Sequence, residues 1–177
     1  MGLFLLVNEP AALLLNITNY LFVFLLIFNL LKVNYFNPIV AIFVKVYKPI
    51  SKELGIFPSQ VINIFIIAVA LKLLSLIIAF GSQYETLTLV GVAIIQTLMI
   101  MLRIIFFGVI GGVILSWVSP EKSNPFIELV EEISRKTLSP VRKYIPSAGG
   151  LDFSPLFILI LINLLESFLA DILRSIV

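Results

Sequence analysis

Residues 119–155 read SPEKSNPFIELVEEISRKTLSPVRKYIPSAGGLDFSP, and they form the one long polar stretch of this chain. The apolar runs on either side of it are each long enough to cross a bilayer. Within the stretch, charges of both signs recur at helical spacing, and prolines and a Gly-Gly pair divide it. We therefore expect a fold in which membrane helices position this polar segment.

The composition of the chain is that of an integral membrane protein. Of its 177 residues, 60% are hydrophobic and 12% are charged, and the mean hydropathy is +1.16. The chain contains neither Cys nor His, so thiol chemistry and the commonest general base and metal ligand are absent from it. We expect no enzymatic activity and no cofactor. The net charge of +2 is small and scattered, so we expect no direct binding of nucleic acid.

Four apolar runs predict an all-α membrane protein with four transmembrane helices. A membrane-spanning helix needs about 20 residues at a rise of about 1.5 Å each. The third run exceeds this length, so it is either one long tilted helix or a broken one. The predicted spans are residues 11–31, 59–80, 87–118 and 156–177.

Two Asn-Pro pairs predict capped helices outside the spans. Asn37-Pro38 opens a short helix to about Lys48, and Asn124-Pro125 opens a second helix with a clearer apolar stripe. We interpret both helices as amphipathic and interfacial, each followed by a proline-rich hinge. The prolines that we expect to end these helices or to open the next span are Pro49, Pro58, Pro140, Pro146 and Pro155.

The order of span, Asn-Pro, amphipathic helix, hinge and span occurs twice. We therefore divide the chain into two parallel repeats, residues 1–85 and residues 86–177. The two hinge loops carry four Lys and five Lys or Arg residues, respectively. By the positive-inside rule, we expect both hinge loops in the cytoplasm and both termini outside.

Three charged side chains, Lys72, Arg103 and Glu166, each fall near the middle of an apolar run, and each needs a partner there. We expect Lys72 to pair with Glu166 across the two repeats, with Asn163 extending a polar stripe. This centre is either a structural clamp, which we favour, or part of an ion or proton path. Arg103 could alternatively mark a helix break at an interface.

Gly108, Gly112 and Ser116 follow one another at four-residue spacing, the pattern that lets membrane helices approach closely. We favour packing within this chain as the explanation. Association of two copies into a homo-oligomer is the alternative.

The polar segment resembles the signature of the bacterial YggT family, also called YlmG. The resemblance lies in residues 140–146, PVRKYIP, and in residues 149–155, GGLDFSP, with residues 116–118, SWV, before them. It implies a small multi-pass protein of the inner membrane without an established enzymatic activity. Relatives in plastids and cyanobacteria are associated with cytochrome complex maturation and membrane organisation. Bacterial relatives are associated with division genes and osmotic stress.

The candidate contact residues for lipids or a membrane-protein partner lie in this signature. Arg142 and Lys143 could face phosphates or an acidic surface, or they could simply set the topology. A turn after them could bind an anion, although capping of the last span is the reading that we favour. The residues of this turn are Gly149, Gly150, Asp152 and Ser154. We expect a scaffold or assembly factor for membrane complexes, with osmotic-stress ion transport as the alternative.

Overall fold

The chain folds into helices only, within the parts that the computed structural model describes, residues 10–53, 56–118, 124–145 and 152–176. Four helices are long and apolar enough to cross a membrane: α1, α3, α4 and α6. The prediction of a multi-pass, all-α membrane protein with four candidate spans is therefore confirmed. The helices are α1 (Pro10–Leu30), α2 (Pro38–Glu53), α3 (Gln60–Phe80), α4 (Thr86–Val118), α5 (Pro125–Arg142) and α6 (Ser154–Ile176).

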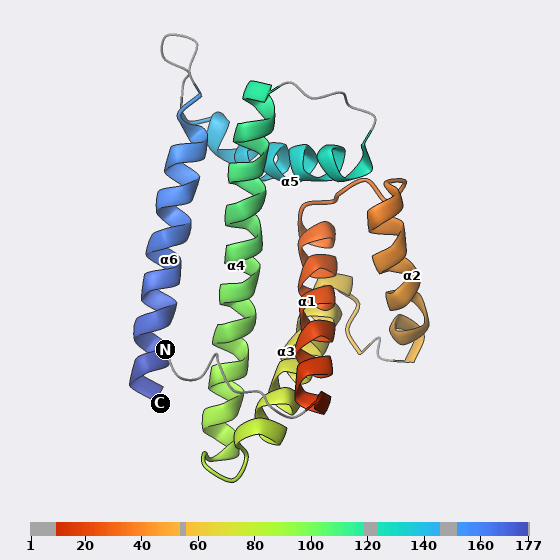
Figure 1. Cartoon of the computed structure of the whole chain (residues 1–177), viewed down its shortest axis with the longest axis vertical. Helices are drawn as coiled ribbons and strands as arrows, with labels where there is room; N and C mark the ends of the chain where they lie inside the picture. The colour runs from red at the N-terminus through yellow and green to blue at the C-terminus, as the bar shows by residue number, and fades with distance from the viewer. Residues whose placement is uncertain (1–9, 54–55, 119–123, 146–151, 177) are drawn as a thin grey trace.

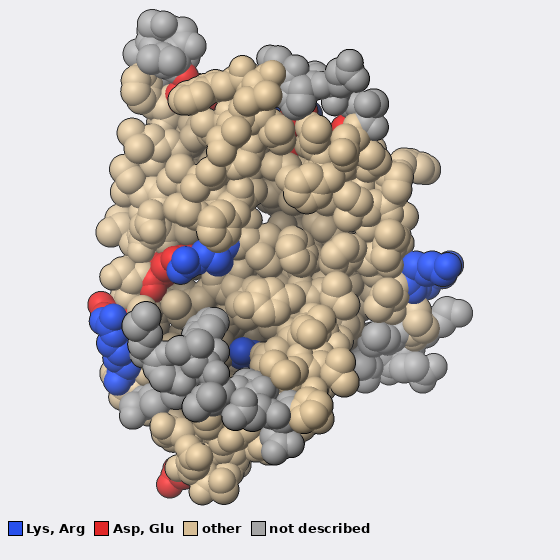
Figure 2. All heavy atoms as spheres, viewed as in Figure 1, with Lys and Arg blue, Asp and Glu red and all other residues tan. Residues whose placement is uncertain are grey.

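The spans place both Asn-Pro hinges at one end of the molecule (Figure 1). The end of α1, the end of α4 and the whole of α5 lie there, whereas the start of α1, the turn between α3 and α4, and the end of α6 lie at the opposite end. Figure 2 shows few charged side chains on the face in view, as is typical of a surface that meets lipid.

Helix α4 is continuous over 33 residues, which decides between the two readings of the third apolar run. Arg103 lies inside this unbroken helix, so the suggestion that it marks a helix break is wrong. The apolar core joins the helices in groups. One cluster joins α1, α3 and α4 around Phe22, Ile64 and Ile100, and another joins α4, α5 and α6.

Helices α2 and α5 pack in different ways. In Figure 1, α5 crosses α4, whereas α2 runs beside α1. Gly108, Gly111 and Gly112 of α4 allow the crossing, because a methyl group at any of them would press on α5. Helix α1 contains no glycine, and α2 instead packs through rings, with Phe43 edge-on to Phe28 at 5.4 Å between ring centroids.

Two of the expected helix ends are wrong. Helix α2 continues through Pro49 to Glu53, and α5 continues through Pro140 to Arg142. A proline inside a helix removes one N–H donor and crowds the preceding turn, but the remaining hydrogen bonds can carry the helix onward. Pro58 lies before Ser59, which occupies the N-cap position of α3 without a side-chain hydrogen bond to the helix.

Candidate functional site

The two Asn-Pro hinges meet at one junction. Asn37 and Asn124 each accept a hydrogen bond from the backbone N–H two residues onward, at 2.9 Å, and so cap α2 and α5. The amide nitrogen of Asn37 also donates to the carbonyl of Pro125 at 2.7 Å. Pro38 and Pro125 are the first helical residues after these caps. The first hinge is therefore bonded directly to the second.

Helix α5 also holds the linker between α1 and α2. The backbone N–H of Asn34 donates to both carboxylate oxygens of Glu132 at 3.1 Å. Lys136 pairs with Glu132 at 3.0 Å and donates to the carbonyl of Lys32. This arrangement includes an i, i+4 ion pair of Glu132 and Lys136 on α5. It adds a role that the sequence did not reveal, because the partners in the linker lie about a hundred residues away.

The crossing of α4 and α5 depends on small side chains. A Cβ at Gly108 would lie 2.9 Å from Ile133, and one at Gly111 would lie 2.8 Å from Val130. A Cβ at Gly112 would collide with Ser134, which is itself buried. Gly108 and Gly112 thus face α5 of the same chain. Ser116 is exposed, and its hydroxyl donates to the carbonyl of Val113 within α4.

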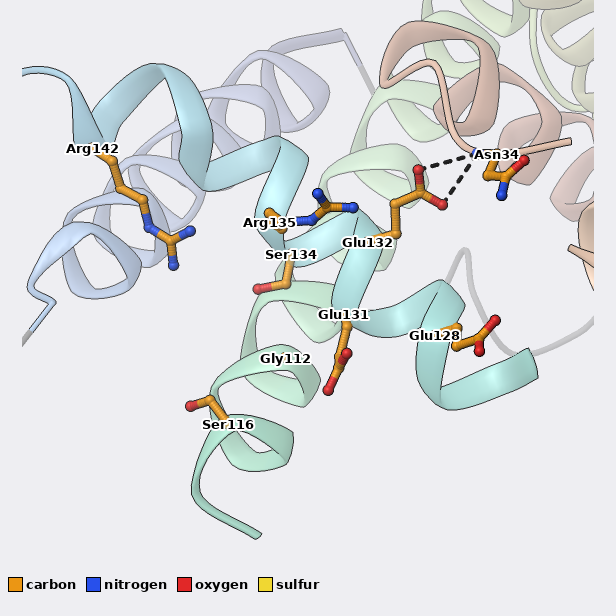
Figure 3. Close-up of a pocket in the computed structure, with 9 residues that line it drawn as sticks. All are labelled: Asn34, Gly112, Ser116, Glu128, Glu131, Glu132, Ser134, Arg135 and Arg142. Carbon is orange, nitrogen blue, oxygen red and sulfur yellow. Dashed lines mark hydrogen bonds between the residues drawn. The ribbon is translucent and has the colours of Figure 1, made fainter. Parts of the chain in front are cut away.

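A polar pocket of about 610 Å³ lies beside this crossing (Figure 3). Figure 3 shows its three glutamates toward the start of α5 and Arg142 toward the end. Charged groups of both signs suit it to a polar segment of a partner better than to an apolar ligand. Its lining residues are Asn34, Gly112, Ser116, Glu128, Glu131, Glu132, Ser134, Arg135 and Arg142.

Arg142 and Asp152 form an ion pair that joins α5 to the start of α6, with 2.7 Å between Nε and Oδ2. Asp152 also accepts a hydrogen bond from the backbone N–H of Ser154 at 2.9 Å, so it caps α6, as we expected for this turn. Partial burial would raise the pKa of Asp152, but the bonds from Ser154 and the charge of Arg142 hold it below its usual range. Pro155 follows as the second residue of α6.

The other predicted residues of this segment fall into two groups. Lys143 is exposed, and its side chain makes no hydrogen bond or ion pair with any residue that the structure describes. Pro146, Gly149 and Gly150 lie outside the described residues. Over the described ranges, no three His, Cys, Asp or Glu side chains gather in a way that could hold a metal ion.

The expected pair of Lys72 with Glu166 is wrong. Lys72 is buried and donates to the side-chain oxygen of Asn16 at 2.8 Å, so it joins α3 to α1. Glu166 instead binds Arg103 through two hydrogen bonds of 2.8 and 3.0 Å, which join α6 to α4. Asn163 donates to the carbonyl of Leu159 within α6. Charged residues in apolar runs identify groups that need partners, but not which partner the packing supplies.

Comparison with known proteins places the chain in a family. A family model described as CCB3/YggT matches residues 91–173. An uncharacterized protein of Pseudomonas aeruginosa is 32% identical over 158 residues, which cover 83% of this chain and 80% of the relative. The chain belongs to the YggT family. The uncharacterized protein YggT of Escherichia coli K12 is 26% identical over 151 residues, covering 80% of this chain and 77% of that protein.

A further relative, an uncharacterized protein of Haemophilus influenzae, is 29% identical over 146 residues, or 80% of this chain and 79% of the relative. No solved structure matches the chain. The region matched by the YggT family model, residues 91–173, includes nearly all of α4, the whole of α5 and most of α6. It therefore contains the glycine crossing, most of the pocket, and the Arg142–Asp152 pair.

Proposed function

We propose that this protein is a non-enzymatic scaffold or assembly factor of the bacterial inner membrane that docks another membrane protein at its hinge end. The docking residues form what we call the hinge surface, namely the exposed side chains of Trp117, Phe126, Lys143 and Tyr144. The observation that carries the proposal is the exposure of its aromatic rings, 82% for Trp117, 61% for Phe126 and 85% for Tyr144.

Exposed aromatic side chains of this kind fit two roles at once. Trp and Tyr are enriched at the headgroup level of membranes, and large aromatic residues also supply much of the energy of protein interfaces. Lys143 adds a free positive charge suited to lipid phosphates or to an acidic partner surface. A membrane protein bound here would contact both the lipids and the hinge surface.

The internal bonds of the site support a scaffold. Helix α5 is bonded to the α1–α2 linker through Glu132 and Lys136, and to the start of α6 through Arg142. A surface held from several sides loses little conformational freedom on binding, which favours association. Such preorganisation is what a docking platform requires.

The excess of Lys and Arg in the hinge loops favours a cytoplasmic hinge end and termini on the outer side. We also propose that residues 1–85 and 86–177 are diverged copies of one parallel repeat, each with an amphipathic helix. The equivalent caps of Asn37 and Asn124 favour this reading, and the different packing of α2 and α5 would be a later divergence.

Ion transport was the alternative function, and it depended on one polar centre that contained Lys72, Glu166 and Asn163. Lys72 joins α3 to α1, and Glu166 joins α6 to α4, so these groups belong to two separate helix pairs. We therefore do not extend the proposal to transport.

The test is crosslinking in native membranes followed by mass spectrometry, with Lys143→Glu as the variant. Because Lys143 has no partner within the described structure, its reversal changes the surface without breaking an internal bond. Arg142→Glu, in contrast, would also break the pair with Asp152. We expect Lys143→Glu to lose a reproducible partner that the wild type and the control Lys45→Glu, on α2, both retain. Capture that is unchanged by Lys143→Glu, or capture of lipid alone, would contradict the proposal.

A further inference from the structure

The ion pair of Arg103 and Glu166 lies midway along α4 and α6, yet it is open on one side. The side chain of Arg103 is 58% exposed, whereas that of Glu166 is 13% exposed. Figure 2 shows blue and red side chains touching at mid-height over α4 and α6, among uncharged atoms. Glu166 accepts from Nε and Nη2 of Arg103, so the N–H groups on Nη1 have no acceptor among the described residues.

A pocket of about 360 Å³ between α1 and α4 opens next to this pair. Its polar lining consists of Tyr20, Gln96 and Arg103, and Phe107 is among its apolar residues. Gln96 is only 4% exposed, and its side chain makes no hydrogen bond to any described residue. The hydroxyl of Tyr20 likewise has no partner in the described ranges. Polar groups without a partner among the described residues therefore lie around one pocket within the membrane spans.

Lipid tails cannot satisfy these groups, because hydrocarbon offers no hydrogen-bond acceptor. Exposed apolar side chains on α6 can contact lipid tails as favourably as they contact a protein, so their exposure does not indicate a partner. The polar groups, in contrast, require a covering surface that brings an acceptor to the middle of the span. A second membrane helix with a polar side chain at that depth meets the requirement.

We propose that a second copy of this chain supplies that surface, with its Asn163 beside Arg103 and the pocket of the first copy. A two-fold axis along the membrane normal leaves the depth of every residue unchanged. Asn163 lies one turn from Glu166, which is bonded to Arg103, so Asn163 of the second copy arrives near the depth of Arg103. Asn163 is exposed, and its N–H donates to Leu159, which leaves its carbonyl oxygen as an acceptor.

The dimer is independent of the hinge surface. The residues involved lie in the middle of α1, α4 and α6, whereas the hinge surface lies at the end of the molecule where α5 crosses α4. Gly108 and Gly112 take no part in it, because they already face α5. Either proposal could fail without the other.

Crosslinking of differently tagged copies tests the contact, and the absence of Cys from the chain makes single-cysteine variants simple to interpret. One copy carries Asn163→Cys and the other carries Phe107→Cys, whose position lines the pocket and is 61% exposed. Purified protein in liposomes at a low protein-to-lipid ratio should give the mixed disulfide. A control copy with Ile66→Cys, on α3 and also exposed, should not pair with Phe107→Cys.

Single-molecule photobleaching on the same liposomes gives a second test, because it measures the association constant of the dimer. Asn163→Leu removes the acceptor and leaves an apolar exposed residue, so the fold is retained. We expect dimer dissociation to become roughly three- to tenfold more favourable, as for the loss of one interhelical hydrogen bond. Thr18→Val, which removes a hydroxyl bonded to its own helix at Leu14, should have no effect. Two results would overturn the proposal. One is a protein that stays monomeric at every protein-to-lipid ratio. The other is a dimer whose association constant does not change in Asn163→Leu and that forms no disulfide between Asn163→Cys and Phe107→Cys.

Discussion

Arg103 and Lys72 show two ways in which a membrane helix accommodates a basic side chain. Lys72 is 8% exposed and donates to the neutral side chain of Asn16, within the packed pair of α1 and α3. Arg103 is more exposed and is neutralised by Glu166 through two hydrogen bonds. Removal of the Glu166 carboxylate would therefore leave Arg103 as an unpaired charge, whereas it would not change the contact of Lys72 with Asn16.

The first prediction concerns this pair. Glu166→Gln should lower the free energy of unfolding by about 1.5–3 kcal/mol, the range for loss of a hydrogen bond to a charged group. Chemical unfolding in detergent measures the change. The exchanged protein Arg103→Glu/Glu166→Arg should regain part of the loss, whereas Lys72→Glu/Glu166→Lys should be no better than the single variants. If Lys72→Glu/Glu166→Lys regained stability instead, Lys72 and Glu166 would have to be paired, in contradiction to the structure.

The second prediction concerns the pH dependence given by Asp152. Its pKa is lower in the folded protein, so the folded state binds the proton more weakly than the unfolded state. The stabilising effect of Asp152 is therefore fully present above the ordinary pKa of about 3.9, and it is lost as the pH falls through the lower folded pKa. Asp152→Asn keeps an oxygen that can cap α6 but loses the charge.

The measurement for Asp152 is thermal unfolding by circular dichroism in detergent at a series of pH values. Wild type should be the more stable protein at neutral pH, and the difference from Asp152→Asn should shrink as the pH falls below about 4. A difference that stays constant with pH would show that the carboxylate does not act through its charge.

At the scale of elements, the crossing of α4 and α5 follows from where the glycines lie. Gly112 is placed so that an added methyl group would collide with Ser134, whereas one at Gly91 of the same helix would meet Ile176 at an ordinary 3.6 Å. The two glycines therefore differ in function although both lie within α4. Gly91 leaves room for a side chain, and Gly112 does not.

The third prediction uses this contrast. Gly112→Ala should destabilise the protein by about 1–3 kcal/mol through overpacking against α5. Gly91→Ala should be neutral or stabilising, because alanine favours a helix over glycine by about 1 kcal/mol. Thermal unfolding of both variants in detergent measures the effect. Ser134→Gly should restore part of the stability of Gly112→Ala, and a lack of any rescue would argue against the close contact.

The positions of the helices could largely be predicted from the sequence, but the contacts between the helices could not. Apolar run length located the four spans, and the Asn-Pro pairs located the starts of α2 and α5, because both signals are local. The helix ends that we expected at Pro49 and Pro140 were wrong, because a proline lowers the stability of a helix without always ending it. The partners of Lys72 and Glu132 could not be found in this way, because they depend on which helices pack together.

At the scale of the whole molecule, the two Asn-Pro pairs lie at one end, so a single topology measurement places both of them. The fourth prediction is that a cysteine at Ser139, in α5, reacts with a membrane-impermeant maleimide only after the cells are opened. A cysteine at Ser82, in the turn between α3 and α4, should react in cells with a permeable outer membrane. Both serines are exposed, and the chain has no other cysteine. The opposite pattern of labelling would place the hinge end outside.

Asn37 connects the two halves of the molecule through its side chain. Its side-chain oxygen caps α2, and its nitrogen donates to the carbonyl of Pro125 in the other half. Asn124 caps α5 in the same way, but its nitrogen makes no hydrogen bond in the described structure. Replacement of each by Asp keeps the oxygen that caps the helix and removes only the nitrogen.

The fifth prediction follows from this difference. Asn37→Asp should destabilise the protein by about 1–2 kcal/mol, because a buried donor is lost and a carboxylate then faces the carbonyl of Pro125. Asn124→Asp should be neutral, since a carboxylate at a helix N-terminus caps as well as an amide does. Hydrogen exchange should show faster opening of α2 and of the start of α5 in Asn37→Asp. Equal behaviour of the two variants would mean that the hydrogen bond from Asn37 to Pro125 adds nothing measurable to the contact between the halves.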